Sequence, residues 1–304
     1  MEYVLTTNAL TKQYGHFKAL DGLSMRVPKG SIYGFVGKNG AGKTTLIRLI
    51  CGLQEPTSGE YCLYGRRNTE KNIEKSRRRM GAVVETPSIY QNMTAEDNMK
   101  QQYQILGLPS LEGIDDLLEL VGLSGTGKKK AKNFSLGMKQ RLGIAIALAG
   151  DPDILVLDEP VNGLDPQGII EIRELILKLN RERQITVLIS SHILDELSRL
   201  ASHYGFIDKG HMVKEISAKE LENACRKCIR LEVTSTKVLA RVLDELKIEY
   251  TILSDTEADV YGKIGITELI LALKKDNCEI ITLHERDESL ESYYISLLGG
   301  DSHE

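Results

Sequence analysis

The chain has 304 residues, of which 27% are charged and 41% hydrophobic, and its formal net charge at pH 7 is −4. This length accommodates one large domain and a smaller one, and the composition is that of an ordinary globular protein. The small net charge gives no reason to expect nucleic acid or an anionic membrane surface as a partner.

The sequence also predicts a compartment. No apolar run approaches the roughly 20 residues that cross a bilayer, so we expect any membrane role to depend on a separate protein. Residues 1–4 show no basic segment followed by an apolar run, which excludes a recognisable signal peptide. Five scattered cysteines, an odd number, are typical of a reducing cytosol. We therefore expect a cytoplasmic protein.

The first part of the chain predicts antiparallel strands followed by a buried strand. Residues 3–27 carry short strand-like runs separated by turn residues. The apolar run over residues 31–36 then predicts a buried strand that leads directly into a glycine-rich loop.

That loop matches the phosphate-binding pattern G-x-x-x-x-G-K-[ST] at every fixed position. Its glycines let backbone N–H groups turn towards phosphate oxygens, Lys43 supplies a charge for the outer phosphates, and the hydroxyl of Thr44 is placed for Mg²⁺. A helix predicted over residues 43–53 directs its N-terminal dipole at the same phosphates. The motif predicts binding of ATP or GTP, and it consists of Gly37, Lys38, Asn39, Gly40, Ala41, Gly42, Lys43, Thr44 and Thr45.

Beyond the loop, strands and helices alternate. Short strands are predicted over residues 59–65 and 82–84, a helical pattern covers 94–122, and another helix covers 136–149. Two strongly apolar strands follow at 154–157 and 185–189, with a helix over 166–183 between them. Such an alternation predicts an α/β fold with a parallel sheet that is covered on both faces.

Two carboxylates follow the first of these apolar strands. Asp158 can hold Mg²⁺ through water, and Glu159 can polarise an attacking water molecule. Three further motifs lie nearby: the segment 134–141 opens a helix with Ser135 at its N-terminus, the segment 162–166 follows the acids, and His192 follows the next strand after two serines. Taken alone, Ser135 would be an ordinary helix cap and His192 a structural histidine.

Together these motifs resemble the ATPase subunit of ATP-binding cassette (ABC) transporters over residues 3–215. The resemblance implies a P-loop NTPase (RecA-like) core with antiparallel β and helical subdomains, and ATP and Mg²⁺ as cofactors. It also implies that segment 134–140, with Ser135 and Gly137, reads the γ-phosphate of ATP on an opposite subunit. By the same resemblance Asp165 is the D-loop aspartate, His192 the switch histidine, and Tyr14 the aromatic that stacks on adenine.

The chain departs from the family pattern in two places. The family signature usually reads Leu-Ser-Gly-Gly-Gln, and here Leu136 and Met138 replace a Gly and the Gln, while Ser135 and Gly137 are kept. Most members carry a glutamine where this chain has Glu85, whose carboxylate can ligate Mg²⁺ directly or through water. These departures are similar to the bacitracin-resistance and lantibiotic-immunity exporter branch.

The C-terminal residues predict a second unit. We expect domains over residues 1–216 and 217–304, the latter with the strand and helix order βαββαβ of a small ferredoxin-like α+β domain. No catalytic pattern lies in it, and a regulatory or binding role stays open. Cys225 and Cys228 have the spacing of a zinc or redox pair, but without a second pair they favour two semi-buried thiols.

The resemblance implies a homodimer that binds two ATP molecules and drives a separately encoded multi-span permease from the inner face of the membrane. Residues 88–132 are the expected docking surface for the permease. The rival interpretation is a soluble ABC ATPase that acts on ribosomes or DNA, and such proteins usually carry tandem cassettes or a long coiled-coil insertion, which this chain lacks. A GTPase is disfavoured because no guanine-reading Asn-Lys-x-Asp motif occurs.

Overall fold

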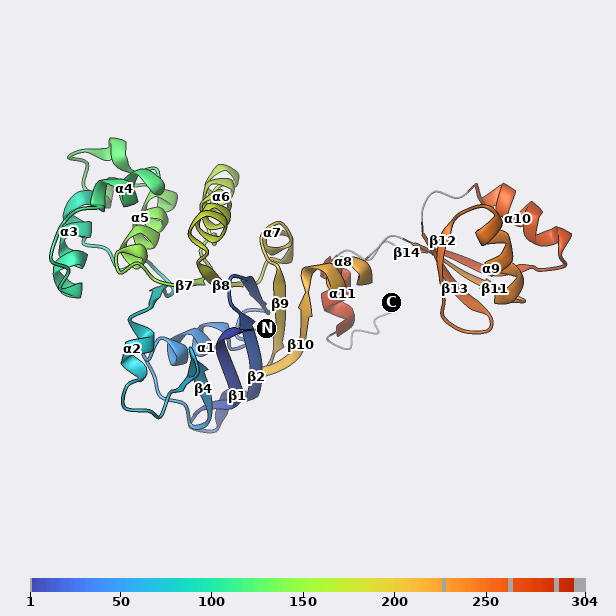
Figure 1. Ribbon diagram of the computed structural model, residues 1–304, viewed down its shortest axis with the longest axis horizontal. Coiled ribbons are helices and arrows are strands. Elements are labelled where there is room, and N and C mark those ends of the chain that lie inside the picture. The colour runs from blue at the N-terminus through green and yellow to red at the C-terminus, as the bar shows by residue number, and fades with distance from the viewer. Residues whose placement is uncertain (1, 226–227, 262–264, 287–289, 298–304) are drawn as a thin grey trace. The chain divides into compact units, whose positions relative to one another are not determined.

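The computed structural model describes residues 2–225, 228–261, 265–286 and 290–297. It consists of two compact units, Met1–Ala218 and Lys219–Glu304 (Figure 1).

The first unit is built around a six-stranded sheet of order β10-β9-β3-β8-β7-β6. All neighbouring strands are parallel except β9 and β10. Strands β3, β7 and β8 are buried along their whole length, as expected for a sheet with both faces covered. This confirms the predicted α/β core, and its strands are β3 (Ile32–Val36), β6 (Met80–Val83), β7 (Ile154–Asp158), β8 (Thr186–Ser191), β9 (His203–Asp208) and β10 (His211–Ser217).

An antiparallel sheet of order β2-β1-β4-β5 packs against this core. The broken runs of the first 28 residues form two long strands, and register shifts within their pairing accommodate the turn residues. Apolar residues of both sheets and of the first helix share one core, with Leu5, Phe35 and Ile47 completely buried. The strands are β1 (Tyr3–Tyr14), β2 (Phe17–Pro28), β4 (Ser58–Leu63) and β5 (Arg66–Arg67).

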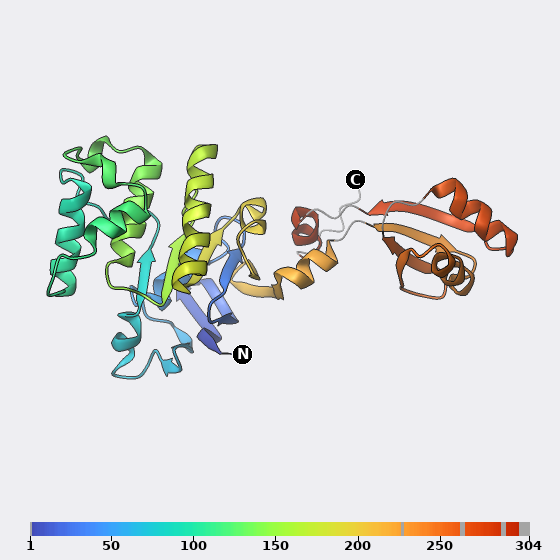
Figure 2. The same cartoon turned by 45° about the horizontal axis from the view of Figure 1, so that its top comes forward.

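The predicted helical stretch over residues 94–122 is two helices, α3 (Ala95–Leu106) and α4 (Ile114–Leu120). Thr94 and Asp97 form a capping box at the start of α3. Gly107 and Gly113, both with positive φ, end one helix and begin the next. Figures 1 and 2 show α3, α4 and α5 gathered apart from the antiparallel sheet. The other helices of this unit are α1 (Lys43–Ile50), α2 (Ile73–Arg77), α5 (Leu136–Leu148), α6 (Pro166–Arg183) and α7 (Leu194–Ser198), with 3₁₀ turns at Ser124–Thr126 and Ala131–Asn133.

The second unit has a four-stranded sheet of order β12-β13-β11-β14, in which every neighbouring pair is antiparallel. With α9 and α10 these strands follow the βαββαβ order that the sequence predicts. Leu231, Leu239, Val260 and Leu269 form its core and are almost completely buried. Its elements are α8 (Ala218–Ala224), β11 (Cys228–Val233), α9 (Thr236–Glu245), β12 (Glu249–Ile252), β13 (Glu257–Tyr261), α10 (Ile266–Lys275), β14 (Ile280–Arg286) and α11 (Leu290–Leu297).

Candidate functional site

The phosphate loop connects the end of β3 to the start of α1. Gly42 lies at the N-terminus of α1 with φ of 112°, and a Cβ there would lie 2.5 Å from the carbonyl oxygen of Ala19, so only glycine fits. The helix has no side-chain cap, which leaves its first-turn N–H groups for a ligand. Within the loop, Lys38, Asn39 and Gly40 are exposed, Gly37, Ala41, Gly42 and Lys43 are buried, and Thr44 and Thr45 are half-buried.

Lys43 is held by its own loop and by the predicted catalytic carboxylate. Its ammonium group donates hydrogen bonds to the carbonyl oxygens of Gly37, at 2.7 Å, and Lys38, at 3.2 Å. It also lies 3.1 Å from Oε1 of Glu159, and its side chain is only 5% exposed. The structure therefore brings together two predicted site residues that are more than a hundred positions apart in the sequence.

The ends of β7 and β8 position the two acids and the histidine. Asp158 pairs in register with Ser190, whose hydroxyl donates to Oδ1 of Asp158 at 2.6 Å and accepts from the backbone N–H of Glu159 at 2.9 Å. Glu159 has a positive φ of 47°, and its Oε2 lies 2.6 Å from Nδ1 of His192. Ser190 thus orients both acids, a role that sequence reasoning missed because it depends on strand register.

The residues around Asp158 fit a magnesium ion. The Asp158 carboxylate is 2% exposed and, among the residues that the structure describes, forms no ion pair. A buried carboxylate without a counter-ion is costly, so a cation at this position would stabilise it. Carboxylate and hydroxyl oxygens, such as that of Thr44, are the ligands that Mg²⁺ prefers.

Glu85 follows β6 and makes a different contact from the one predicted. Its backbone is left-handed, with φ of 60°, and its carboxylate pairs with the guanidinium of Arg48 on α1. Pro87 in the same segment packs against α5, because a Cβ on Gly143 would lie 2.6 Å from Cβ of Pro87. The role of Glu85 as a metal ligand remains a prediction.

Tyr14 lies at the end of β1 with its ring partly exposed. Its hydroxyl donates to Oε1 of Gln54, and the ammonium group of Lys12 lies 5.3 Å from the ring centroid. An exposed aromatic ring is suited to stacking on a base. Adenine binding by Tyr14 remains a prediction.

The remaining predicted residues cap helices. The hydroxyl of Ser135 accepts from the backbone N–H of Met138 at 3.2 Å and caps α5, and the carboxylate of Asp165 accepts from Gly168 at 3.1 Å and caps α6. Gly137, in the first turn of α5, is half-buried. In the described part of the chain Ser135 makes no hydrogen bond with the phosphate loop, so its pairing with ATP across a dimer remains a prediction.

A further carboxylate near the site was not predicted. Burial raises the pKa of Glu196 on α7, the neighbouring acids Asp195 and Glu159 raise it further, and His192 acts in the opposite direction. One oxygen of Glu196 is buried without a hydrogen-bond partner. No motif in the sequence marks this residue.

The ABC transporter family matches residues 20–162 of the chain. The bacitracin transport ATP-binding protein BcrA of Bacillus licheniformis is 42% identical over 99% of both chains. This chain belongs to the family of ABC transporter ATP-binding proteins. The lantibiotic transport ATP-binding protein SrtF of Streptococcus pyogenes is 44% identical over 72% of this chain and 93% of its own. A solved ATP-binding cassette of an ABC transporter in its ADP conformation matches with a TM-score of 0.66 and 28% identity, over 72% of this chain and 93% of that one.

Family membership confirms the nucleotide chemistry and the partners that the motifs predicted. The chain is an ABC ATPase that uses ATP with Mg²⁺ and works with a membrane permease at the cytoplasmic face of the membrane. Within the described residues, no helix has both the length and the apolar character needed to cross a bilayer. In this part of the chain, no group of three or more His, Cys, Asp or Glu side chains is suited to hold a metal ion. Cys225 and Cys228 therefore belong to no such group.

Proposed function

We propose that this ABC ATPase powers the export of a peptide antibiotic of the bacitracin class through a separately encoded permease. Export protects the cell that carries the transporter from the antibiotic. The observation that carries the proposal is the match to a bacitracin transport subunit over nearly the full length of both chains. That match includes the C-terminal unit. The match to the lantibiotic transport protein covers 93% of that protein but only 72% of this chain.

The proposed hydrolysis depends on a change of partners at Glu159. In the structure its two oxygens contact Lys43 and His192. When a triphosphate draws the ammonium group of Lys43 to its outer phosphates, Glu159 loses that contact and keeps His192. The freed oxygen then accepts a hydrogen bond from the attacking water and polarises it. Bound Mg²⁺, held by Thr44 and Asp158, would neutralise charge on the β- and γ-phosphates.

The proposed dimer places a second copy's signature against this nucleotide. Ser135 and Gly137 lie at an exposed helix N-terminus, where backbone N–H groups and a positive dipole favour an anion. Two copies that face each other therefore enclose two ATP molecules, each held by the phosphate loop of one copy and the signature of the other. Asp165 and Tyr14 complete the proposed nucleotide contacts.

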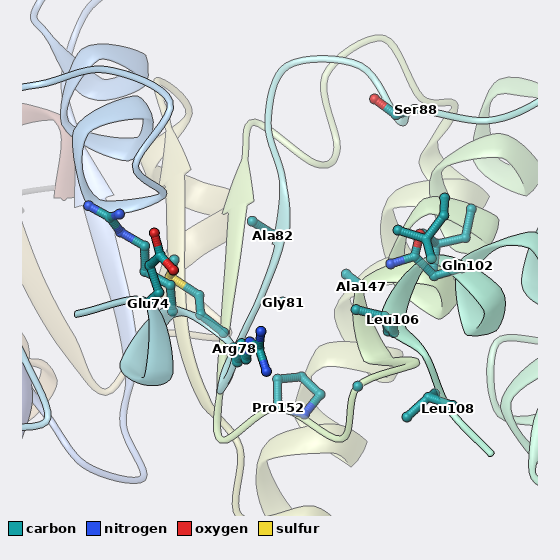
Figure 3. Close-up of a pocket in the computed structure, with 15 residues that line it drawn as sticks. Glu74, Arg78, Gly81, Ala82, Ser88, Gln102, Leu106, Leu108, Ala147 and Pro152 are labelled. Atoms are coloured by element: carbon teal, nitrogen blue, oxygen red, sulfur yellow. The ribbon is translucent and has the colours of Figure 1, made fainter. Parts of the chain in front are cut away.

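The permease is proposed to dock in a groove between the core and the helical segment. A cavity of about 730 Å³ lies between α2 and β6 on one side and α3 and α5 on the other (Figure 3). Ile105 and Leu106 line it and are exposed, and Arg77 and Arg78 add positive charge to the opposite wall. Exposed apolar side chains beside charged ones are typical of a protein-binding groove. No residue of the phosphate loop lines this cavity, so docking would leave the nucleotide site open.

Bacitracin susceptibility of cells provides the test. Cells that express the chain together with the membrane protein of the same gene neighbourhood should tolerate more bacitracin than cells with the membrane protein alone. The matched control is Glu159→Gln, which should bind ATP and co-purify with the permease but lose steady-state hydrolysis and protection. Equal susceptibility of wild-type and control cells would refute the antibiotic substrate, and normal turnover by Glu159→Gln would refute the catalytic role.

A further inference from the structure

Arg48 occupies a position from which it can control Glu85. It lies on α1 four residues after Thr44, so the two side chains project from the same face of the helix, one turn apart. The guanidinium of Arg48 pairs with the Glu85 carboxylate. The carboxylate predicted to reach Mg²⁺ is therefore held by the same helix that carries Thr44, whose hydroxyl is proposed to bind that ion.

Strand register brings Glu85 to the correct edge of the sheet. Val83 at the end of β6 pairs with Leu157 of β7. Glu85 and Glu159 each lie two residues beyond this pair. Both have positive φ, an uncommon conformation for residues other than glycine. Glu85 lies two residues beyond the end of β6, and its left-handed backbone brings the side chain to Arg48 of α1.

The ion pair is suited to exchange because solvent reaches it. The Arg48 and Glu85 side chains are 36% and 51% exposed, and ion pairs at such sites are weak. A divalent cation bound by Thr44, one turn before Arg48 on α1, would compete for the same carboxylate. The pair also lines a second cavity, of about 470 Å³, that contains Pro87 and Gly143, so this segment contacts both the phosphate-loop helix and the signature helix.

We propose that Arg48 is a positioning residue that holds Glu85 away from the magnesium site until Mg²⁺ and ATP bind together, when Glu85 moves from the guanidinium to the metal. Arg48 thereby lowers the affinity of the protein–ATP complex for Mg²⁺ and, to the same degree, the affinity of the protein–Mg²⁺ complex for ATP. This inference rests on the proposed role of Glu85 toward Mg²⁺, and it does not depend on which antibiotic is exported.

The measured quantity is the ratio of the dissociation constants of trinitrophenyl-ATP in EDTA and in saturating MgCl₂. This ratio reports how strongly Mg²⁺ and nucleotide stabilise each other's binding. Arg48→Gln should raise the ratio about two- to fivefold, the range expected for loss of a partly exposed ion pair. Arg48→Lys should resemble the wild type, because it keeps the charge.

The double variant separates the proposed switch from a general effect of charge. In a Glu85→Gln background, Arg48→Gln should leave the ratio unchanged, because the carboxylate for which arginine and metal compete is gone. Arg79→Gln is the matched control: Arg79 is 51% exposed, pairs with Asp153, and lies at the opposite end of β6, so its loss should not alter the ratio.

The inference is overturned if Arg48→Gln leaves the ratio at the wild-type value, or if the same increase appears in the Glu85→Gln background or in Arg79→Gln. Failure of the proposed ATP site gives a different result: Lys43→Ala would then bind trinitrophenyl-ATP as the wild type does in both EDTA and MgCl₂.

Discussion

The N-termini of α1 and α5 both present backbone N–H groups to a proposed phosphate, but the two ends are built differently. The end of α1 begins with Gly42, has no side-chain cap, and carries a buried lysine that contacts Glu159. The end of α5 is exposed and already capped by the hydroxyl of Ser135. At the α1 end, a nucleotide would replace the existing contact between Lys43 and Glu159. At the α5 end, the Ser135 hydroxyl already accepts a hydrogen bond from a backbone N–H of its own helix. We infer that α1 provides the principal site within one copy and α5 the part that only a second copy uses.

The largest effect is expected at the α1 end. Lys43→Ala should weaken ATP binding by roughly 10- to 100-fold, because it removes charge-assisted hydrogen bonds to phosphate of about 1.5–3 kcal/mol. Nucleotide titration measures this change. Lys29→Ala, which removes an exposed lysine outside the loop, is the matched control and should bind ATP as the wild type does. Similar losses in the two variants would mean that the buried position of Lys43 has no special role.

A smaller effect, of another kind, is expected at the α5 end. Ser135→Ala should leave ATP affinity of the single copy unchanged but lower the free energy of unfolding by about 1 kcal/mol, because the cap is lost. It should also weaken the ATP-dependent dimer, which sedimentation measures in the Glu159→Gln background. Ser135→Gly separates these effects, since glycine costs only a few tenths of a kcal/mol as a cap and still lacks the hydroxyl. A normal dimer in both variants would limit Ser135 to capping.

The smallest effect is expected at Glu196, and it should have the opposite sign to that of Ser135→Ala. Burial raises the pKa of Glu196, so the folded protein binds a proton more tightly than the unfolded chain does. The free energy of unfolding therefore falls as pH rises from the ordinary glutamate pKa through the raised one. Glu196→Gln should stabilise the protein at pH 7 by less than about 1 kcal/mol, since solvent screens the group.

Thermal unfolding at pH 4 and pH 7 tests this expectation. The gain should be present at pH 7 and small or absent at pH 4, where the wild-type carboxylate is protonated. Glu174→Gln, at an exposed position on α6, is the control. A loss of stability at pH 7 in Glu196→Gln would show that the charged form makes a favourable contact beside His192.

The sequence predicted the residues whose role depends on local order along the chain. A glycine-rich loop between a strand and a helix, two acids after an apolar strand, and a histidine after the next strand can each be recognised because their spacing is local. The apolar runs likewise predicted the parallel core, which the structure confirms. The helical pattern over residues 94–122 was less exact, because the left-handed glycines that divide it do not alter the apolar periodicity.

Only the tertiary structure decided which of these residues meet. The pairing of β7 with β8 gives Ser190 its two contacts, and the same edge of the sheet brings Lys43 to Glu159. The contact between Glu85 and Arg48 follows from a left-handed turn after β6. Periodicity reports which residues are buried, but it does not contain strand order or register, and these set the distances between charges from distant parts of the chain.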